Sequence, residues 1–259
     1  MQNQEELNHQ DTLSPVPEDP FKKKNMEGIE KYKNKILLGD CLEVIKELPD
    51  KSIDLLVTDP PYSISLNGGG SIKKKIDYRR GSLLGIGSNP NFTLIPFLDV
   101  VRPKLKIFHA YIWMSKDTLP ETLSWILKNK FMWNILIWSK VNPVPAYNNT
   151  YLSDIEYCVF IREKGGCHWT KDLGYEMYKK VMIDHVQSLP GHPTPKSMWM
   201  MEKLIKVSSK IGDLILDPYA GSGTTCIAAR NLKRDFIGIE INAEYKKYAE
   251  GRLRQEVLF

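Results

Sequence analysis

The sequence contains few cysteines, and their positions exclude two common classes of site. Four occur among the 259 residues, at positions 41, 158, 167 and 226, and no two form a C-x-x-C pair. Neither a zinc knuckle nor a disulfide framework is indicated, and His109, His168 and His185 have no partners at ligand spacing, so we expect no metal. Scattered cysteines suit a reducing compartment, and we expect a cytoplasmic protein.

Long apolar runs and a strong charge imbalance are also absent. No run approaches the ~18 residues that a transmembrane helix needs. The first six residues are polar and acidic, unlike a signal peptide. The net charge of +5 permits a polyanionic partner without requiring one. With 42% hydrophobic and 26% charged residues, the composition is that of a globular protein, and the length suits one α/β domain.

Hydrophobic periodicity divides the chain into a tail and one domain. Residues 1–30 lack apolar periodicity and contain three prolines and a lysine run, so we predict a flexible tail before a domain at 31–259. Inside the domain, residues 63–92 form a long basic loop and residues 163–190 are irregular and polar-aromatic. Strands are predicted at 36–38, 53–57, 110–114, 133–138, 156–161, 214–216 and 236–240. Helices are predicted at 41–48, before 103, and at 121–128, 198–208, 224–231 and 243–253.

A glycine loop near the carboxyl end of the chain has the context of a nucleoside site. Gly221 and Gly223 lie between a strand and a helix, and Glu240 ends the next strand, 19 residues after Gly221. The glycines let backbone approach a ligand, and an acidic side chain at that point can accept both hydroxyls of a ribose. Position 226 is cysteine and the lysine of a P-loop is missing, so a nucleoside fits better than a dinucleotide or triphosphate. A tight turn without ligand is the alternative.

A second motif, Asp59-Pro60-Pro61-Tyr62, follows a buried strand, where ligands gather in open α/β sheets. The Asp59 carboxylate and the Pro60 carbonyl can accept both N–H bonds of an exocyclic amine, which stabilises the charge that develops when the amine attacks a methyl sulfonium. Consecutive prolines hold that carbonyl rigidly, and the Tyr62 ring can stack on a base taken out of a duplex. The alternative is a proline turn capped by Asp59.

In order and content, these motifs resemble the amino-methyltransferases of DNA, which make N6-methyladenine or N4-methylcytosine. The resemblance covers about residues 35–253 and is to the permuted group, in which the tetrad precedes the cofactor loop. Gly39-Asp40-Cys41-Leu42 and the tetrad resemble the family's opening, and the segment 138–143 its middle. His192-Pro193-Thr194-Pro195-Lys196 resembles the segment before the loop, and residues 217–224 the loop itself. Ser197 and Tyr219 depart from the family's common Pro and Phe.

This resemblance implies a Rossmann-like, doubly wound sheet and S-adenosylmethionine as cofactor. It assigns catalysis to Asp59, Pro60, Pro61 and Tyr62. Glu240 would bind the cofactor ribose, Asp40 its adenine, and Lys196 and His192 would lie by its methionine end. The complete set of expected cofactor-binding residues is Asp40, Cys41, Asp59, His192, Lys196, Asp217, Tyr219, Gly221, Ser222, Gly223, Thr224, Glu240 and Asn242.

Double-stranded DNA is the partner that the resemblance implies, with a homodimer and a cognate restriction endonuclease as further expectations. We interpret residues 163–190 as a target-recognition insert. Asp as the first tetrad residue favours adenine N6 over cytosine N4, which stays open. An RNA or small-molecule methyltransferase and an inactive DNA-binding subunit are the competing interpretations. Phosphate contacts are expected from the basic loop at Lys73, Lys74, Lys75, Arg79 and Arg80. The alternative is a solvated basic loop that makes no DNA contact.

Overall fold

A computed structural model describes residues 28–61, 93–143, 151–186 and 195–255 of the chain. Residues 1–27 of the predicted tail and the whole of the predicted basic loop, residues 63–92, therefore lie outside the described residues. The described chain opens with a helical turn at residues 28–30, where Ile29 is 3% exposed and packs in the core. No helix among the described residues is long and apolar enough to cross a membrane.

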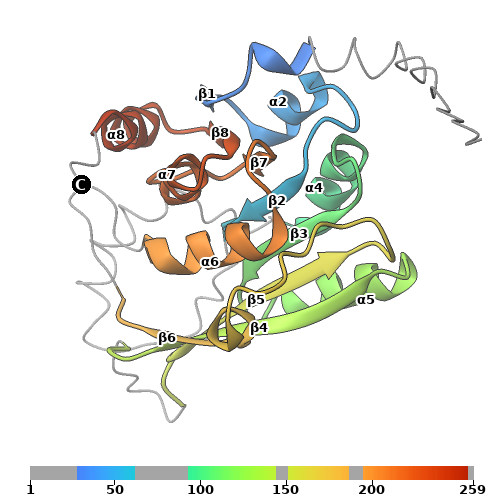
Figure 1. Cartoon of the computed structure of the whole chain (residues 1–259), viewed down its shortest axis with the longest axis vertical. Coiled ribbons are helices and arrows are strands. Elements are labelled where there is room, and N and C mark those ends of the chain that lie inside the picture. Colours follow the sequence, from blue (N-terminus) through green and yellow to red (C-terminus); the bar gives the residue numbers. More distant parts are fainter. Residues whose placement is uncertain (1–27, 62–92, 144–150, 187–194, 256–259) are drawn as a thin grey trace, which may run out of the picture.

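The described residues form an eight-stranded sheet in the order β1-β8-β7-β2-β3-β5-β4-β6 (Figure 1). All neighbouring strands are parallel except β5, which runs antiparallel to both β3 and β4. The amino end of β5 therefore lies at the same edge as the carboxyl ends of the other strands. In chain order the strands are β1 (Lys35–Leu38), β2 (Leu55–Thr58), β3 (His109–Met114), β4 (Met132–Lys140), β5 (Ile155–Arg162), β6 (Val181–Asp184), β7 (Leu214–Asp217) and β8 (Asp235–Glu240).

Helices cover both faces of the sheet, as Figure 1 shows. On one face lie α2 (Cys41–Glu47), α4 (Leu94–Val101) and α5 (Leu119–Lys128). On the other lie α6 (Met198–Ser208), α7 (Thr224–Asn231) and α8 (Ala243–Arg254). Alternate strand residues feed two cores: Leu56 packs with the first set of helices, and Leu55 and Val57 with the second. The expected doubly wound α/β class is confirmed.

Most predicted elements occur within one or two residues of their expected bounds, and two differences are informative. β2 starts at Leu55, because Ile53 makes only an isolated bridge to Leu105. The expectation that residues 163–190 are wholly irregular was wrong, since β6 lies there and pairs with β4. Its four residues alternate in burial, with Met182 at 1% exposure, and they are too few for the apolar pattern to stand out among polar neighbours. Two short 3₁₀ helices, η1 (Arg102–Lys104) and η2 (Tyr175–Tyr178), complete the described elements.

Candidate active site

The sequence motifs converge where the carboxyl ends of β8, β7 and β2 lie side by side. Glu240 ends β8, Asp217 ends β7, and Asp59 follows β2 directly. Pro60 is buried, and Asp59 keeps 31% of its side chain exposed. Three carboxylates from distant parts of the chain therefore meet at one edge of the sheet, the usual position of ligands in open α/β folds.

The glycine loop is held against Glu240 by backbone hydrogen bonds. Gly221 and Gly223 have φ angles of 50° and 78°, in the left-handed region that glycine enters without penalty. The Gly221 amide donates to Glu240 Oε2 at 2.8 Å, and the Asn242 amide donates to Oε1 at 2.8 Å. Burial raises the pKa of the Glu240 carboxyl above its ordinary value. Each oxygen keeps a second lone pair that can accept from a hydroxyl, as a diol ligand requires.

The hydroxyl groups of the glycine loop form hydrogen bonds within the protein. Ser222 Oγ and Thr224 Oγ1 lie 3.1 Å apart, and both residues are buried. The Arg252 guanidinium on α8 donates to the Ser222 carbonyl at 2.7 Å and to Thr224 Oγ1 at 3.2 Å. A ligand would therefore meet the backbone here more than these side chains. Asn242 likewise caps α8, with its side chain accepting from the amides of residues 244 and 245.

Asp217 is a buried carboxylate next to the tetrad. Its Oδ1 accepts from Thr58 Oγ1 at 2.8 Å and from the Tyr219 amide at 3.2 Å. Burial, assisted by the negative charge of Asp59, raises the pKa of the Asp217 carboxyl to about 6. A cationic ligand beside it would relieve that cost, since an opposite charge favours the ionised form.

Tyr219 joins the loop to the first helix of the domain. Its side chain forms a hydrogen bond with the Cys41 thiol, and its ring meets Phe97 edge-on with centroids 5.5 Å apart. Burial raises the pKa of the Cys41 thiol to about 11, so it stays protonated. Asp40 caps α2 by accepting from the Leu42 amide at 2.8 Å. The hydroxyl by which Tyr219 differs from the family's usual Phe thus has a partner.

Alternating charges surround the tetrad carboxylate. Lys196 Nζ lies 2.6 Å from Asp59 Oδ2 and 2.9 Å from Glu156 Oε2, and Lys140 Nζ lies 2.7 Å from Glu156 Oε1. Burial opposes the charge of Lys196, but Asp59 and Glu156 together raise the pKa of its ammonium above the ordinary value. Burial would likewise raise the pKa of Glu156, yet the two lysines outweigh it and lower the pKa to about 2. Lys196 and Glu156 are therefore both ionised at neutral pH.

These groups fit one kind of ligand. Asp217 and Asp59 offer negative charge to a cation, Glu240 offers acceptors to a diol, and the glycine loop offers its backbone to both. A nucleoside that carries a cationic group meets all three requirements. S-adenosylmethionine, with its ribose, ammonium and sulfonium, has this chemistry.

The chain matches known proteins along most of its length. Residues 53–251 match the N6/N4 family model described as DNA methylase. The chain belongs to this DNA methylase family.

Members of the family resemble the chain in both sequence and structure. The Type II methyltransferase M2.MboI of Moraxella bovis is 31% identical, over 85% of this chain and 87% of its own. The Type II methyltransferase M.HinfI of Haemophilus influenzae is 28% identical, over 88% and 70%. The crystal structure of the M1.HpyAVI–SAM complex is 27% identical with a TM-score of 0.65, covering 84% of this chain and 98% of that one.

The structure of this DNA methylase brings together the described motif residues and adds others that the sequence reasoning missed. Glu156, Lys140 and Thr58 were not among the predicted site residues. Glu156 contacts Lys196 and Thr58 contacts Asp217, both of which were predicted, and Lys140 contacts Glu156. Glu156 is a charge beside the apolar run of β5, a signal that becomes readable only once β5 is known to be antiparallel. The predicted residues that lie outside the described part of the chain are Tyr62, Lys73, Lys74, Lys75, Arg79, Arg80 and His192.

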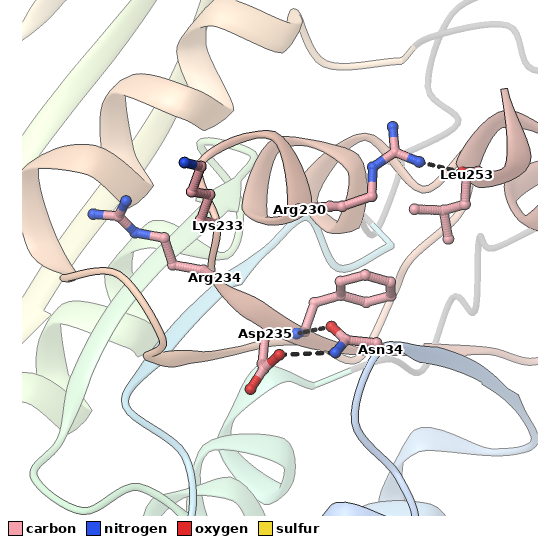
Figure 2. A pocket seen from close by; sticks show the side chains of 7 residues that line it. Asn34, Arg230, Lys233, Arg234, Asp235 and Leu253 are labelled. Atoms are coloured by element: carbon pink, nitrogen blue, oxygen red, sulfur yellow. Dashed lines mark hydrogen bonds between the residues drawn. The ribbon is translucent and has the colours of Figure 1, made fainter. Parts of the chain in front are cut away.

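A basic pocket at the amino end of β8 lies at the opposite edge of the methylase sheet. Figure 2 shows Arg230 directed to the Leu253 carbonyl and Asn34 bridging Asp235 and its neighbour. Arg234 donates to the carbonyls of Leu232 and Ser209. Because these cations already have backbone partners, we regard the pocket as structural.

Proposed function

We propose that this chain transfers a methyl group from S-adenosylmethionine to the N6 amine of adenine at specific sites in double-stranded DNA. The observation that carries the proposal is the adjacency of Asp59, at the end of β2, to Asp217, at the end of β7. This adjacency supports a role for Asp59 as amine acceptor beside a site suited to a sulfonium nucleoside. The SAM complex of M1.HpyAVI supports the choice of cofactor.

In this proposal Asp59 and the Pro60 carbonyl accept the two N–H bonds of the target amine, and Tyr62 stacks on the flipped base. Pro61 keeps the turn rigid. Lys196 stays protonated because its pKa is raised, so it orients Asp59 rather than acting as a base. The amine becomes acidic only after it has received the methyl group, so its proton can then pass to solvent without a strong base.

The cofactor-binding roles follow the same geometry. Glu240 would accept from the ribose hydroxyls, and Asn242 orients it. Asp217 would face the methionine ammonium, with the backbone of residues 219–224 lining the ligand. Asp40, Cys41, Lys196 and His192 complete the proposed pocket.

DNA contacts are proposed for the basic loop and for one end of the segment 163–190. Trp169 packs on Phe160 and Tyr178, away from the edge where Asp59 lies, so this half of the segment lies apart from the catalytic edge. The chain leaves β6 at Asp184, at the catalytic edge, where Asp184 accepts from the Trp199 indole at 2.7 Å. We therefore assign target reading to the residues that follow Asp184. The phosphate contacts stay assigned to Lys73, Lys74, Lys75, Arg79 and Arg80.

A homodimer is proposed on the basis of an apolar strip over β4, β5 and β6. Ile155, Val181 and Ile183 are 41%, 51% and 66% exposed, and the register puts them on the face covered elsewhere by α4 and α5. Ile183→Glu should shift the sedimentation profile to the monomer, while unchanged sedimentation would count against this surface. The Type II names of the relatives support a cognate restriction endonuclease as the second partner.

The experiment that tests the proposed function is incubation with labelled S-adenosylmethionine and, in separate reactions, mixed-sequence duplex DNA or RNA, followed by nucleoside analysis. Label in N6-methyl-2′-deoxyadenosine from the DNA is expected. Label in N4-methylcytosine would identify cytosine as the target base, and label in RNA alone would favour an RNA enzyme. Cofactor binding without any transfer would favour an inactive DNA-binding subunit.

A further inference from the structure

Glu156 reaches the catalytic edge from a strand that carries neither of the sequence motifs. It is the second residue of β5, and its partner across the sheet is Trp138, near the carboxyl end of β4. Because β5 is antiparallel, its first residues lie beside the ends of β3 and β4 that face the site. The Glu156 side chain is 20% exposed and forms ion pairs with two lysines.

We propose that Glu156 is a positioning residue for methyl transfer. It binds the same Lys196 ammonium that binds Asp59, and so fixes the Asp59 carboxylate for the incoming amine. The inference rests on the proposed function and adds to it a residue outside the tetrad and the glycine loop.

The geometry gives Lys196 one defined place. A lysine side chain has high rotamer entropy, and contacts at its tip are needed to hold it. Here the ammonium is paired with two carboxylates, and it lies 5.3 Å from the Trp113 ring centroid and 5.9 Å from that of Trp138. Without Glu156 the ammonium would lose its ion pair to β5 and keep the one to Asp59. The ion pair with Glu156 holds the Lys196 ammonium against a strand of the sheet.

The charges of the network also support a positioning role for Glu156. A lysine paired with Asp59 alone would direct its whole charge to that carboxylate and weaken it as an acceptor for the amine. Sharing the ammonium with Glu156 leaves more negative charge on Asp59, where positive charge develops in the transition state. Lys140 in turn neutralises Glu156. Side-chain exposure rises from 8% at Lys196 to 31% at Asp59, so the network opens toward solvent at the catalytic carboxylate.

The first test is Glu156→Gln, which keeps the size of the side chain and removes its charge. We expect kcat to fall about tenfold, equivalent to about 1.4 kcal/mol in the barrier, while KM for S-adenosylmethionine and for DNA changes less than about twofold. The fluorescence of a 2-aminopurine target base should rise as in the wild type, because flipping does not involve Glu156.

Asp54→Asn is the matched control. Asp54 precedes β2, at the end of the strand opposite to Asp59, and its side chain is 19% exposed and lies 2.8 Å from Lys106 Nζ. This variant should lower the melting temperature and leave kcat unchanged at a temperature where it is folded. Equal losses of kcat in the two variants would overturn the proposal, as would a Glu156→Gln variant with wild-type kcat and a raised cofactor Kd.

A conservative variant keeps the proposal testable if Glu156→Gln does not fold. Glu156→Asp retains the charge on a side chain shorter by one methylene, and we expect a kcat between those of Glu156→Gln and the wild type, with both KM values retained. Wild-type kcat in Glu156→Asp, when Glu156→Gln is unfolded, would overturn the positioning role. The proposed function fails separately, if the wild-type chain itself does not methylate DNA.

Discussion

Replacing Asp217 with asparagine should stabilise the ligand-free protein while removing cofactor binding. Asp217 is 3% exposed, and burial followed by the charge of Asp59 raises the pKa of its carboxyl from 3.8 to about 6. Asparagine is close in size, and its carbonyl can still accept from Thr58 Oγ1 and the Tyr219 amide. The substitution therefore removes a buried charge and keeps these two hydrogen bonds.

The size of the effect follows from linkage. A carboxyl whose pKa is raised on folding contributes stability that is present below pH 3.8 and is lost as the pH rises through about 6. This difference between the folded and unfolded pKa corresponds to about 3 kcal/mol in the free energy of unfolding. The free energy of unfolding of Asp217→Asn should thus equal that of the wild type near pH 4. At pH 7 it should be higher by up to about 3 kcal/mol.

The assay is urea unfolding of both proteins, without cofactor, at several pH values between 4 and 8. An Asp217→Asn protein that is less stable than the wild type at pH 7, or a difference that does not vary with pH, would refute the reasoning. Calorimetric titration with S-adenosylmethionine is the second measurement. Wild-type affinity for S-adenosylmethionine should rise as the pH passes through 6, because the bound ammonium favours the ionised carboxylate, and Asp217→Asn should lose this dependence together with most of the affinity.

Further predictions concern the other carboxylates of the site. Asp59→Ala should abolish methyl transfer while the Kd for S-adenosylmethionine, measured by calorimetry, stays within a few-fold; equal loss of both would contradict its catalytic role. Glu240→Gln should raise that Kd roughly 10- to 100-fold, because the new amide group faces the amide of Gly221 or Asn242, and an unchanged affinity would exclude the ribose role. Glu156, with a pKa lowered from 4.5 to about 2, contributes about 3 kcal/mol that is present above pH 4.5 and lost as the pH falls through 2. Urea unfolding of Glu156→Gln should show a weaker loss of stability over that interval than the wild type.

Local patterns were sufficient to predict the parts of the site that lie on single strand-to-loop junctions. The apolar run before Asp59, and the strand, glycines and helix around Gly221, each contain their own signal, and the structure puts them at one edge of the sheet. The helices at Met198–Ser208 and Thr224–Asn231 have the predicted bounds, because their apolar residues recur at helical spacing over two or more turns.

Pairwise contacts across the sheet were not accessible in the same way. Strand direction is a property of the assembled sheet, and nothing within residues 155–162 marks β5 as the one antiparallel strand among those described. Glu156 therefore could not be placed beside Lys196, 40 residues later in the chain. The Thr58–Asp217 bond, between residues 159 positions apart, depends likewise on which strands become neighbours.

The pairing of β2 with β7 has a consequence for how the protein acquires its activity. Contacts between residues so distant in sequence form slowly, because the chain entropy of a long loop must be lost before they contribute. During synthesis, β2 leaves the ribosome well before its neighbour β7 exists, and the amino-terminal motif has no cofactor loop to meet. Pulse-labelled chains should therefore become competent to bind the cofactor only after the last third of the domain has emerged, however early Asp59 is made.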